Sequence, residues 1–235
     1  MNKIGVVIIC ARAGSKTLKN KNIKKINNIE LVGWSILVGK KIRCIKKIII
    51  SSDSKKIIDI SKKYGALAPF VRPKRLSTSK ANEYEVWKHA IKKIIKIYNF
   101  KPDFIISLPP TCPTRSTKDI NKALYFFLKQ NYDGVVSICE SNRNPYFNIV
   151  KRNILTKKIS IFSKIYNIYR RQDAPKTFDI TTAFYIAKTN YILNSKSFLS
   201  GKIAGYLIKK KNGIDIDDIY DFNLSKIILE NKIEK

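Results

Sequence analysis

Short apolar runs that alternate with helical segments are the feature that most limits how this chain can fold. Four runs lack the polar–apolar alternation of a half-exposed strand, and each has the length of a strand buried on both faces. They lie at 4–10, 47–51, 103–109 and 134–139. Segments with helical periodicity lie at 31–42, 54–64, 84–98 and 117–130. This order predicts an α/β protein with a Rossmann-like, mostly parallel sheet flanked by helices on both faces.

The pattern changes after residue 140. Residues 143–180 are strongly basic, contain several aromatic residues and lack a clear alternation of strand and helix, so we interpret them as an insertion that covers a site or forms a subunit contact. Strand-like runs return at 184–187 and 205–209. A helix over 218–233 would close the chain, with an apolar stripe of Tyr220, Leu224, Ile227 and Ile228. We expect one domain over residues 1–235 with an insertion at about 143–180.

The charge of the chain is strongly positive, with 47 Lys and Arg against 17 Asp and Glu and a formal net charge of +30. Such a balance invites a nucleic-acid-binding hypothesis. The excess is spread along the whole chain, is mostly Lys and accompanies many Ile and Asn residues, as A/T-rich codons would produce. We interpret it as a solvated surface and expect no nucleic-acid partner. A basic nucleic-acid-binding module stays a competing hypothesis.

The cysteines and the apolar content bear on the cellular compartment. The four cysteines are far apart, form no C-x-x-C pair and lie partly inside apolar runs, which favours reduced, buried thiols and argues against zinc. No apolar stretch approaches the roughly 18 to 20 residues of a membrane span, and the first residues resemble a strand rather than a signal peptide. We expect a soluble cytoplasmic protein without a membrane partner.

Residues 10–22, CARAGSKTLKNKN, follow the first apolar run. A glycine-containing loop after the first buried strand of an α/β sheet is where phosphates are usually held. The standard phosphate-loop signatures are absent, because Gly14 is followed by Ser15 before Lys16 and there is no G-x-G-x-x-G. What remains is a set of cations that suits a triphosphate. They are Arg12, Lys16, Lys19 and Lys21, and an ordinary basic loop is the alternative.

A second candidate cluster is GIDIDDIYD at 213–221, in which Asp215 and Asp217 lie on the same side of an extended segment. Two such carboxylates can share a hard cation such as Mg²⁺, which also takes phosphate oxygens and waters, so the pair describes a metal-assisted nucleotidyl transfer site. The alternative is a capping cluster for the following helix. The single histidine, His89, is expected on the surface of its helix, which makes a histidine-based catalytic site improbable.

Several ordered motifs resemble those of the N-acylneuraminate cytidylyltransferase family, the synthetases that activate nine-carbon 2-keto sugar acids with CMP. ARAGSK followed by Lys21-Asn22 is similar to the family's nucleotide loop, ARxGSKxxxxKN. SSDS, FVRPKRLS and PPTCPTR at 51–54, 70–77 and 109–115 are similar to its STDS, RPxxLA and QPTSPLR. RRQDAPKTF at 170–178 and GIDIDDIYD resemble its RRQxLPxxY and SxDIDxxxD. The resemblance runs nearly end to end.

The resemblance implies a fold of the nucleotide-diphospho-sugar transferase type and transfer of CMP from CTP to the anomeric hydroxyl of the sugar, with release of pyrophosphate. The catalytic residues it implies are Lys16, Lys21, Asp215 and Asp217, the two aspartates holding Mg²⁺ or Mn²⁺. The CTP-binding residues it implies are Ala11, Arg12, Gly14, Ser15, Lys16, Lys21, Asn22 and Arg72. The sugar-binding residues it implies are Pro109, Thr111, Arg115, Arg170, Arg171, Gln172, Thr181 and Thr182. It also implies a homodimer, with the insertion as the dimer element that reaches into the neighbouring site.

Three departures from the family pattern fall in regions expected to line the pocket. Pro109 replaces a glutamine, Thr181-Thr182 replaces an asparagine and a glycine, and Asn82-Glu83 replaces a pair of serines. They leave the sugar open, whether N-acetylneuraminate, a legionaminate or pseudaminate relative, or another 2-keto sugar acid. A CMP-3-deoxy-octulosonate synthetase and a non-catalytic sugar-nucleotide-binding protein stay as alternatives.

Overall fold

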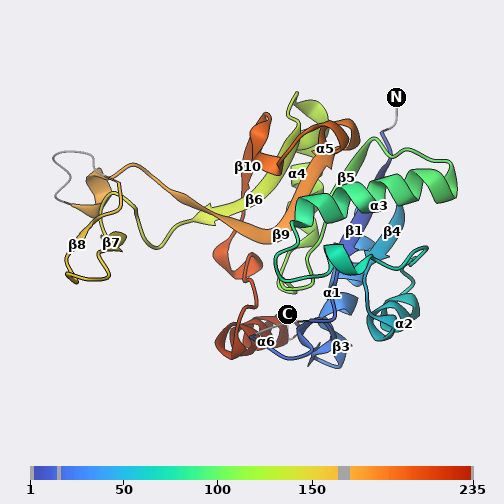
Figure 1. The fold of residues 1–235 in the computed structure, drawn as a ribbon, viewed down its shortest axis with the longest axis horizontal. Helices are drawn as coiled ribbons and strands as arrows, with labels where there is room; N and C mark the ends of the chain where they lie inside the picture. Colours follow the sequence, from blue (N-terminus) through green and yellow to red (C-terminus); the bar gives the residue numbers. More distant parts are fainter. Residues whose placement is uncertain (1–2, 15–16, 164–169, 234–235) are drawn as a thin grey trace.

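The computed structural model describes residues 3–14, 17–163 and 170–233, and its centre is a six-stranded sheet (Figure 1). The strand order is β10-β6-β9-β5-β1-β4, and only β9 runs antiparallel to its neighbours. The strands are β1 (Gly5–Cys10), β4 (Ile45–Ser51), β5 (Phe104–Ser107), β6 (Gly134–Glu140), β9 (Phe178–Lys188) and β10 (Ile203–Leu207). The predicted, mostly parallel sheet is confirmed, with each expected strand present and its ends shifted by a few residues.

Helices cover both faces of this sheet. Because side chains alternate along a strand, Val7 and Ile9 of β1 pack toward one face, whereas Val6 and Ile8 pack toward the other. The first face packs against α1 (Leu31–Gly39), α2 (Lys55–Lys63) and α4 (Thr117–Lys129). The second face packs against α3 (Glu83–Tyr98) and the short α5 (Thr189–Asn194). The layers are therefore helix, sheet and helix, as the sequence predicts.

Local capping explains where three of the helices begin. The hydroxyl of Ser54 accepts a hydrogen bond from the Ile57 N–H at the start of α2, and the Ser116 hydroxyl accepts one from the Asp119 N–H at the start of α4. At the start of α3, the Asn82 side chain accepts from the Tyr84 N–H at 2.9 Å. These caps fix the first residues of α2, α3 and α4.

The last helix, α6 (Ile219–Ile233), packs differently from the expectation. Its buried residues are Ser225 and Leu229. Leu229 joins a small cluster with Leu31 of α1 and with Ile26 of the hairpin formed by β2 (Lys25–Ile26) and β3 (Ile29–Glu30). The predicted stripe of Tyr220, Leu224 and Ile227 is largely exposed, so this prediction is wrong. The physical reason is that the cluster with the hairpin, α1 and Leu18 lies on the Leu229 side of α6, so that side is the buried one.

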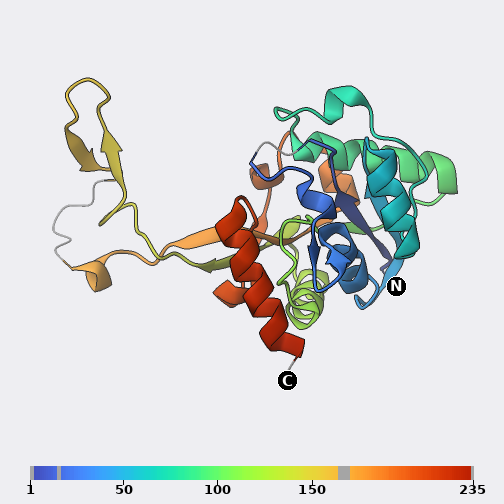
Figure 2. The ribbon, with the colours of Figure 1, turned by 90° about the horizontal axis from the view of Figure 1, so that it is seen from below.

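An arm projects from the body of the molecule (Figures 1 and 2). It is formed by the chain between β6 and β9, and it carries the hairpin of β7 (Val150–Arg152) and β8 (Ile159–Ile161). Ile154 and Leu155 at its turn are 81% and 88% exposed. The insertion expected at about 143–180 therefore corresponds to this arm, although the last strand of the body, β9, already begins at Phe178.

Two further expectations need correction. Cys112 is buried and Cys10 and Cys139 are partly buried, but Cys44 is exposed, because it lies in the turn that leads into β4. His89 is partly buried rather than on the surface, since its ring packs edge-on against Phe70 with the ring centres 5.3 Å apart. Within the described part of the chain, no helix is long and apolar enough to cross a membrane.

Candidate active site

A cavity of about 630 Å³ opens where the carboxyl ends of β1 and β5 diverge. The chain passes from β1 to β4 on one side and later to β5 on the other, and ligands of α/β sheets bind at such a switch point. The structure brings together at this cavity many of the residues that the sequence predicts. They are Arg12, Gly14, Lys21, Asn22, Arg72, Pro109, Thr111, Thr182 and Asp217.

The backbone of the loop after β1 is held in place by two side chains and by the neighbouring strand β4. The Asn22 side-chain amide donates to the Arg12 carbonyl oxygen at 2.9 Å, and the Ala13 N–H donates to the Asp53 carboxylate at 2.9 Å. Ala11 is fully buried and donates its N–H to the Ser51 carbonyl oxygen. Ser15 and Lys16, expected at this loop, lie outside the described residues. The loop thus presents the Arg12 side chain to the cavity from a fixed backbone.

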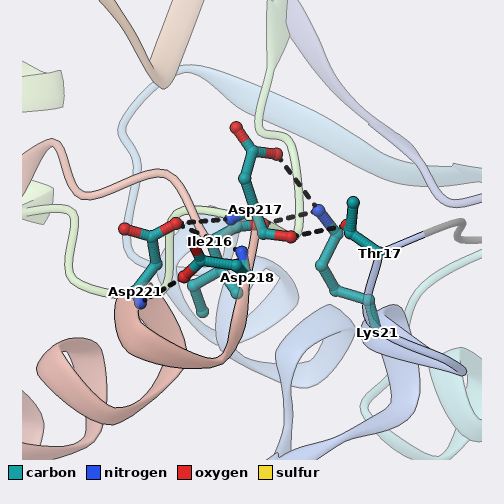
Figure 3. Close-up of polar contacts among 6 residues, drawn as sticks. All are labelled: Thr17, Lys21, Ile216, Asp217, Asp218 and Asp221. Atoms are coloured by element: carbon teal, nitrogen blue, oxygen red, sulfur yellow. Dashed lines mark hydrogen bonds and ion pairs between the residues drawn. The ribbon is translucent and has the colours of Figure 1, made fainter.

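Lys21 and Thr17 join this loop to the segment before α6 (Figure 3). The Lys21 ammonium donates to the Ile216 carbonyl oxygen at 2.5 Å and lies 3.4 Å from the Asp217 carboxylate. The Thr17 hydroxyl donates to the Asp217 carbonyl oxygen at 2.6 Å. These contacts bring residues some 200 positions apart in sequence to one wall of the cavity.

The acidic cluster before α6 divides into two pairs. The Asp218 carboxylate accepts from the N–H groups of Tyr220 and Asp221. The Asp221 carboxylate accepts from those of Asp217 and Asp218 (Figure 3). This reciprocal arrangement is a capping box, so the cap of α6 is formed by the carboxylates of Asp218 and Asp221 and not by those of Asp215 and Asp217. The carboxylates of the other pair, Asp215 and Asp217, take no part in this cap, and that of Asp217 pairs with Lys21.

Asp215 is held beside the loop after β5. The Ile216 N–H donates to the Thr111 carbonyl oxygen at 2.8 Å, which fixes the backbone next to Asp215. Burial raises the pKa of the Asp215 carboxyl, the nearby Asp217 carboxylate raises it further, and the side chains of Thr111 and Lys21 lower it. One Asp215 carboxylate oxygen, Oδ1, is buried and has no hydrogen-bond partner among the described residues. A cation at this position would satisfy that oxygen.

The donor set fits a divalent metal that is completed by substrate. No group of three or more His, Cys, Asp or Glu side chains in the described segments forms a self-sufficient metal site. Mg²⁺, however, is commonly bound by one or two carboxylates with phosphate oxygens and waters as the other ligands. Asp215, with its unpartnered oxygen, and the exposed carboxylate of Asp217 can supply those two protein ligands.

The α3 side of the cavity contains two charged groups. Arg72 is 5% exposed, its N–H donates to the Ser52 carbonyl oxygen, and its guanidinium lies 3.8 Å from the Asp53 carboxylate. Glu83, the first residue of α3, lines the cavity. Glu83 as a whole is exposed, but burial of its carboxyl group raises the pKa of that group. Trp87 and Arg72 offset part of this increase.

Asp53 and Glu83 were not among the predicted site residues. Asp53 lies in the SSDS stretch at 51–54, whose position directly after a buried strand was the available signal. Glu83 lies in one of the three departures from the family pattern. Glu83, Pro109 and Thr182, one residue from each of the three regions that depart from the family pattern, all line the cavity.

Two residues expected at the sugar are instead structural. Arg115 is buried and donates to the Ser35 hydroxyl at 2.7 Å and to the Pro109 carbonyl oxygen, so it lies beneath the loop after β5 rather than in the cavity. Thr181 is buried and its hydroxyl bonds to that of Ser137 at 2.7 Å. Neither side chain lines the cavity, since each is buried and bonded to protein groups, and direct sugar contact at these two positions stays a prediction.

Three more expected sugar residues lie between β8 and β9, and none of them lines the cavity of the same chain. Arg170 forms an ion pair with Asp173 at 2.9 Å, and Arg171 donates to the Asn142 carbonyl oxygen at 2.9 Å. Gln172 is exposed in the short 3₁₀ turn of residues 171–173. Within one chain, therefore, the structure does not bring these residues to the predicted site.

Comparison with known proteins places the chain in a family. A model of the cytidylyltransferase family matches residues 6–228. The chain is 33% identical to the post-translational flagellin modification protein B of Campylobacter coli over 95% of this chain and 94% of that protein. It is also 33% identical, with the same coverage, to the CMP-N,N'-diacetyllegionaminic acid synthase of Campylobacter jejuni.

A solved structure shows a similar fold at low sequence identity. It is a CMP:2-keto-3-deoxy-manno-octonic acid synthetase complexed with CTP, with a TM-score of 0.73 and 12% identity. The superposition covers 98% of this chain and 100% of the other. At this identity the likeness supports the architecture alone.

Proposed function

The chain belongs to the cytidylyltransferase family, and we propose that it transfers CMP from CTP to the anomeric hydroxyl of a sialic-acid-like nine-carbon 2-keto sugar acid, releasing pyrophosphate. The observation that carries this proposal is the meeting of Lys21 with Asp217 at the switch-point cavity. A cationic loop for phosphates and a carboxylate pair for a metal then lie on one wall. That is the arrangement that a nucleotidyl transfer needs.

The residues of the cavity have different roles in the proposed reaction. Arg12 and Lys21, with Lys16 by family resemblance, bind the triphosphate, and Asn22 holds the loop that presents them. Asp215 and Asp217 would hold Mg²⁺ or Mn²⁺, which when bound neutralises charge on the phosphates and orients them. The new bond joins the sugar oxygen to the α-phosphorus of CTP, the bond to the pyrophosphate oxygen breaks, and the hydroxyl proton passes to solvent.

The sugar is proposed to be a modified nonulosonate rather than N-acetylneuraminate. Pro109 lines the cavity and has no side-chain donor, and Thr182 adds a β-branched side chain nearby. The pocket then offers fewer polar contacts for a fully hydroxylated sugar. The name of the Campylobacter jejuni relative, which refers to a diacetyllegionaminic acid, supports the same direction.

The working unit is proposed to be a cytoplasmic homodimer. The exposed apolar turn of the arm, with Ile154 and Leu155, lacks a partner surface within the described chain. A second copy that covers the arm would bury these side chains and place Arg170 and Arg171 at the neighbouring cavity. A bidentate arginine is a natural partner for the carboxylate of a sugar acid.

A pyrophosphate-release assay tests this function. The purified protein, CTP and Mg²⁺ are incubated with N-acetylneuraminate, legionaminate, pseudaminate and 3-deoxy-octulosonate in parallel. We expect release with a nonulosonate, and release with 3-deoxy-octulosonate alone would favour the rival synthetase. Binding of CTP without release with any sugar would favour a non-catalytic binder, and salt-dependent binding of random DNA without CTP binding would favour the nucleic-acid hypothesis.

A further inference from the structure

Residues 213–217, which carry both carboxylates proposed for the metal, form neither helix nor strand. The position of such a segment is set by the individual contacts of its backbone groups. The Ile216 N–H donates to the Thr111 carbonyl oxygen at 2.8 Å. The Asp217 N–H donates to the Asp221 carboxylate at 2.9 Å. The carbonyl oxygens of Ile216 and Asp217 accept from side chains that follow β1, so the place of the Asp217 carboxylate depends on that loop as well.

Two side chains supply these contacts from the loop, and both line the cavity (Figure 3). The Lys21 ammonium donates to the Ile216 carbonyl oxygen at 2.5 Å and lies 3.4 Å from the Asp217 carboxylate. In the proposed reaction it must also serve the phosphates. The Thr17 hydroxyl has one proton to donate, and the Asp217 carbonyl oxygen accepts it at 2.6 Å. Thr17 is therefore an uncharged link between the loop and the carboxylate segment.

The chain on either side of this link is anchored independently. Leu18 follows Thr17, Ile216 precedes Asp217, and the side chains of Leu18 and Ile216 are buried in one apolar cluster with Leu229. Thr17 itself is exposed, so its hydroxyl would bond to water if the link were absent, and its net contribution to stability is small. What the hydrogen bond determines is the position of Asp217 rather than the stability of the fold.

We propose that Thr17 is a positioning residue, which sets the place of the Asp217 carboxylate relative to the triphosphate loop. Groups that hold a metal ligand without touching the metal typically change metal affinity or activity by about 10- to 100-fold when they are removed. Because Thr17 carries no charge, its removal leaves the cations that bind the phosphates unchanged. The effect is therefore expected on the metal and on kcat, and not on the KM for CTP. This inference rests on the proposed function.

The test compares Thr17→Val, which keeps the shape of the side chain without a donor, with Thr17→Ser, which keeps the hydroxyl. Thr17→Val should lower both kcat and the affinity for Mn²⁺ at least about tenfold, with an unchanged KM for CTP, whereas Thr17→Ser should behave like the wild type. Electron paramagnetic resonance measures Mn²⁺ binding in the presence of CTP and without sugar. The melting temperature of Thr17→Val should stay within about 3 °C of the wild type.

The matched control is Ser200→Ala. The Ser200 hydroxyl also donates to a backbone carbonyl oxygen, that of Ser197 at 2.8 Å, but neither residue lines the cavity. This variant should change neither kcat nor the affinity for Mn²⁺.

The outcomes separate this inference from the proposed function. Wild-type kcat and Mn²⁺ affinity in Thr17→Val would overturn the inference, and so would equal losses in Thr17→Val and Thr17→Ser. A raised KM for CTP with an unchanged kcat would assign Thr17 to nucleotide binding instead. If no sugar in the panel supports turnover, the proposed function fails, while the Mn²⁺ affinity with CTP still decides the role of Thr17. If Thr17→Val does not give a wild-type circular dichroism spectrum, Thr17→Ala replaces it and is judged by the same two measurements.

Discussion

The Lys21 ammonium lies 3.4 Å from the Asp217 carboxylate, and the two side chains differ sharply in accessibility. Lys21 is 12% exposed, whereas Asp217 is 77% exposed. The lysine is fixed mainly by the Ile216 carbonyl oxygen, which it contacts at 2.5 Å. The Asp217 carboxylate therefore stays accessible to a metal, while the lysine beside it stays in position for a phosphate.

Replacing Asp217 by Asn should lower kcat at least about 100-fold, the scale of losing a principal electrostatic group of the transition state. The amide keeps the shape of the side chain but is a weaker metal ligand. Pyrophosphate release measured against Mg²⁺ concentration checks this, with the exposed Asp59→Asn as control. Full metal-dependent turnover in Asp217→Asn would remove this residue from the mechanism.

Replacing Lys21 by Met should raise the Kd for CTP roughly tenfold or more, because a partly buried ammonium that faces the phosphates is lost. Lys41→Met, at an exposed turn away from the cavity, should leave the Kd unchanged. Calorimetric titration with CTP measures both. Small and equal effects would instead favour the hypothesis of an ordinary basic loop.

The fold was more predictable from the sequence than the roles of single residues. Buried strands such as β1 and β4 are continuous apolar runs, which leave a local signal. The stripe of α6 was misjudged because the sequence of this helix does not show which face meets the β2–β3 hairpin. A motif also does not show whether its arginine points into a cavity or beneath a loop, which is why Arg115 was placed at the sugar.

Replacing Arg115 by Met should lower the free energy of unfolding by about 1–3 kcal/mol, since the Pro109 carbonyl oxygen and the Ser35 hydroxyl lose a buried donor. Burial lowers the pKa of Arg115. The positive charge of Arg115 is unfavourable in this buried position, so removing it offsets part of the loss in the free energy of unfolding. Urea unfolding measures the change, with the exposed Arg43→Met as control. A stable variant with a raised KM for the sugar would restore the sugar-contact hypothesis.

Replacing Glu83 by Gln should stabilise the protein more at pH 8 than at pH 5. Burial raises the pKa of Glu83 above its unfolded value, so its stabilising contribution is present at low pH and is lost as pH rises through the folded pKa. Glutamine carries no charge at either pH, so the variant does not lose this stability as the pH rises. The surrounding titratable groups, Cys10, Arg72, Tyr185 and Asp215, are unchanged in the variant. Melting temperatures at both pH values measure the effect, and an equal shift at both would contradict it.

A mixed dimer of two inactive variants should recover activity if the arm completes the partner's site. One variant carries Arg170→Ala and Arg171→Ala on the arm, and the other carries Asp217→Asn in the cavity. In a heterodimer, the wild-type arm of the second subunit would serve the wild-type cavity of the first, so one site is intact. Random mixing makes half of the dimers mixed, which predicts about a quarter of wild-type pyrophosphate release. Refolding the variants together and separately measures this gain. Activity no greater than the sum of the separate samples would show that each arm serves only its own chain or none.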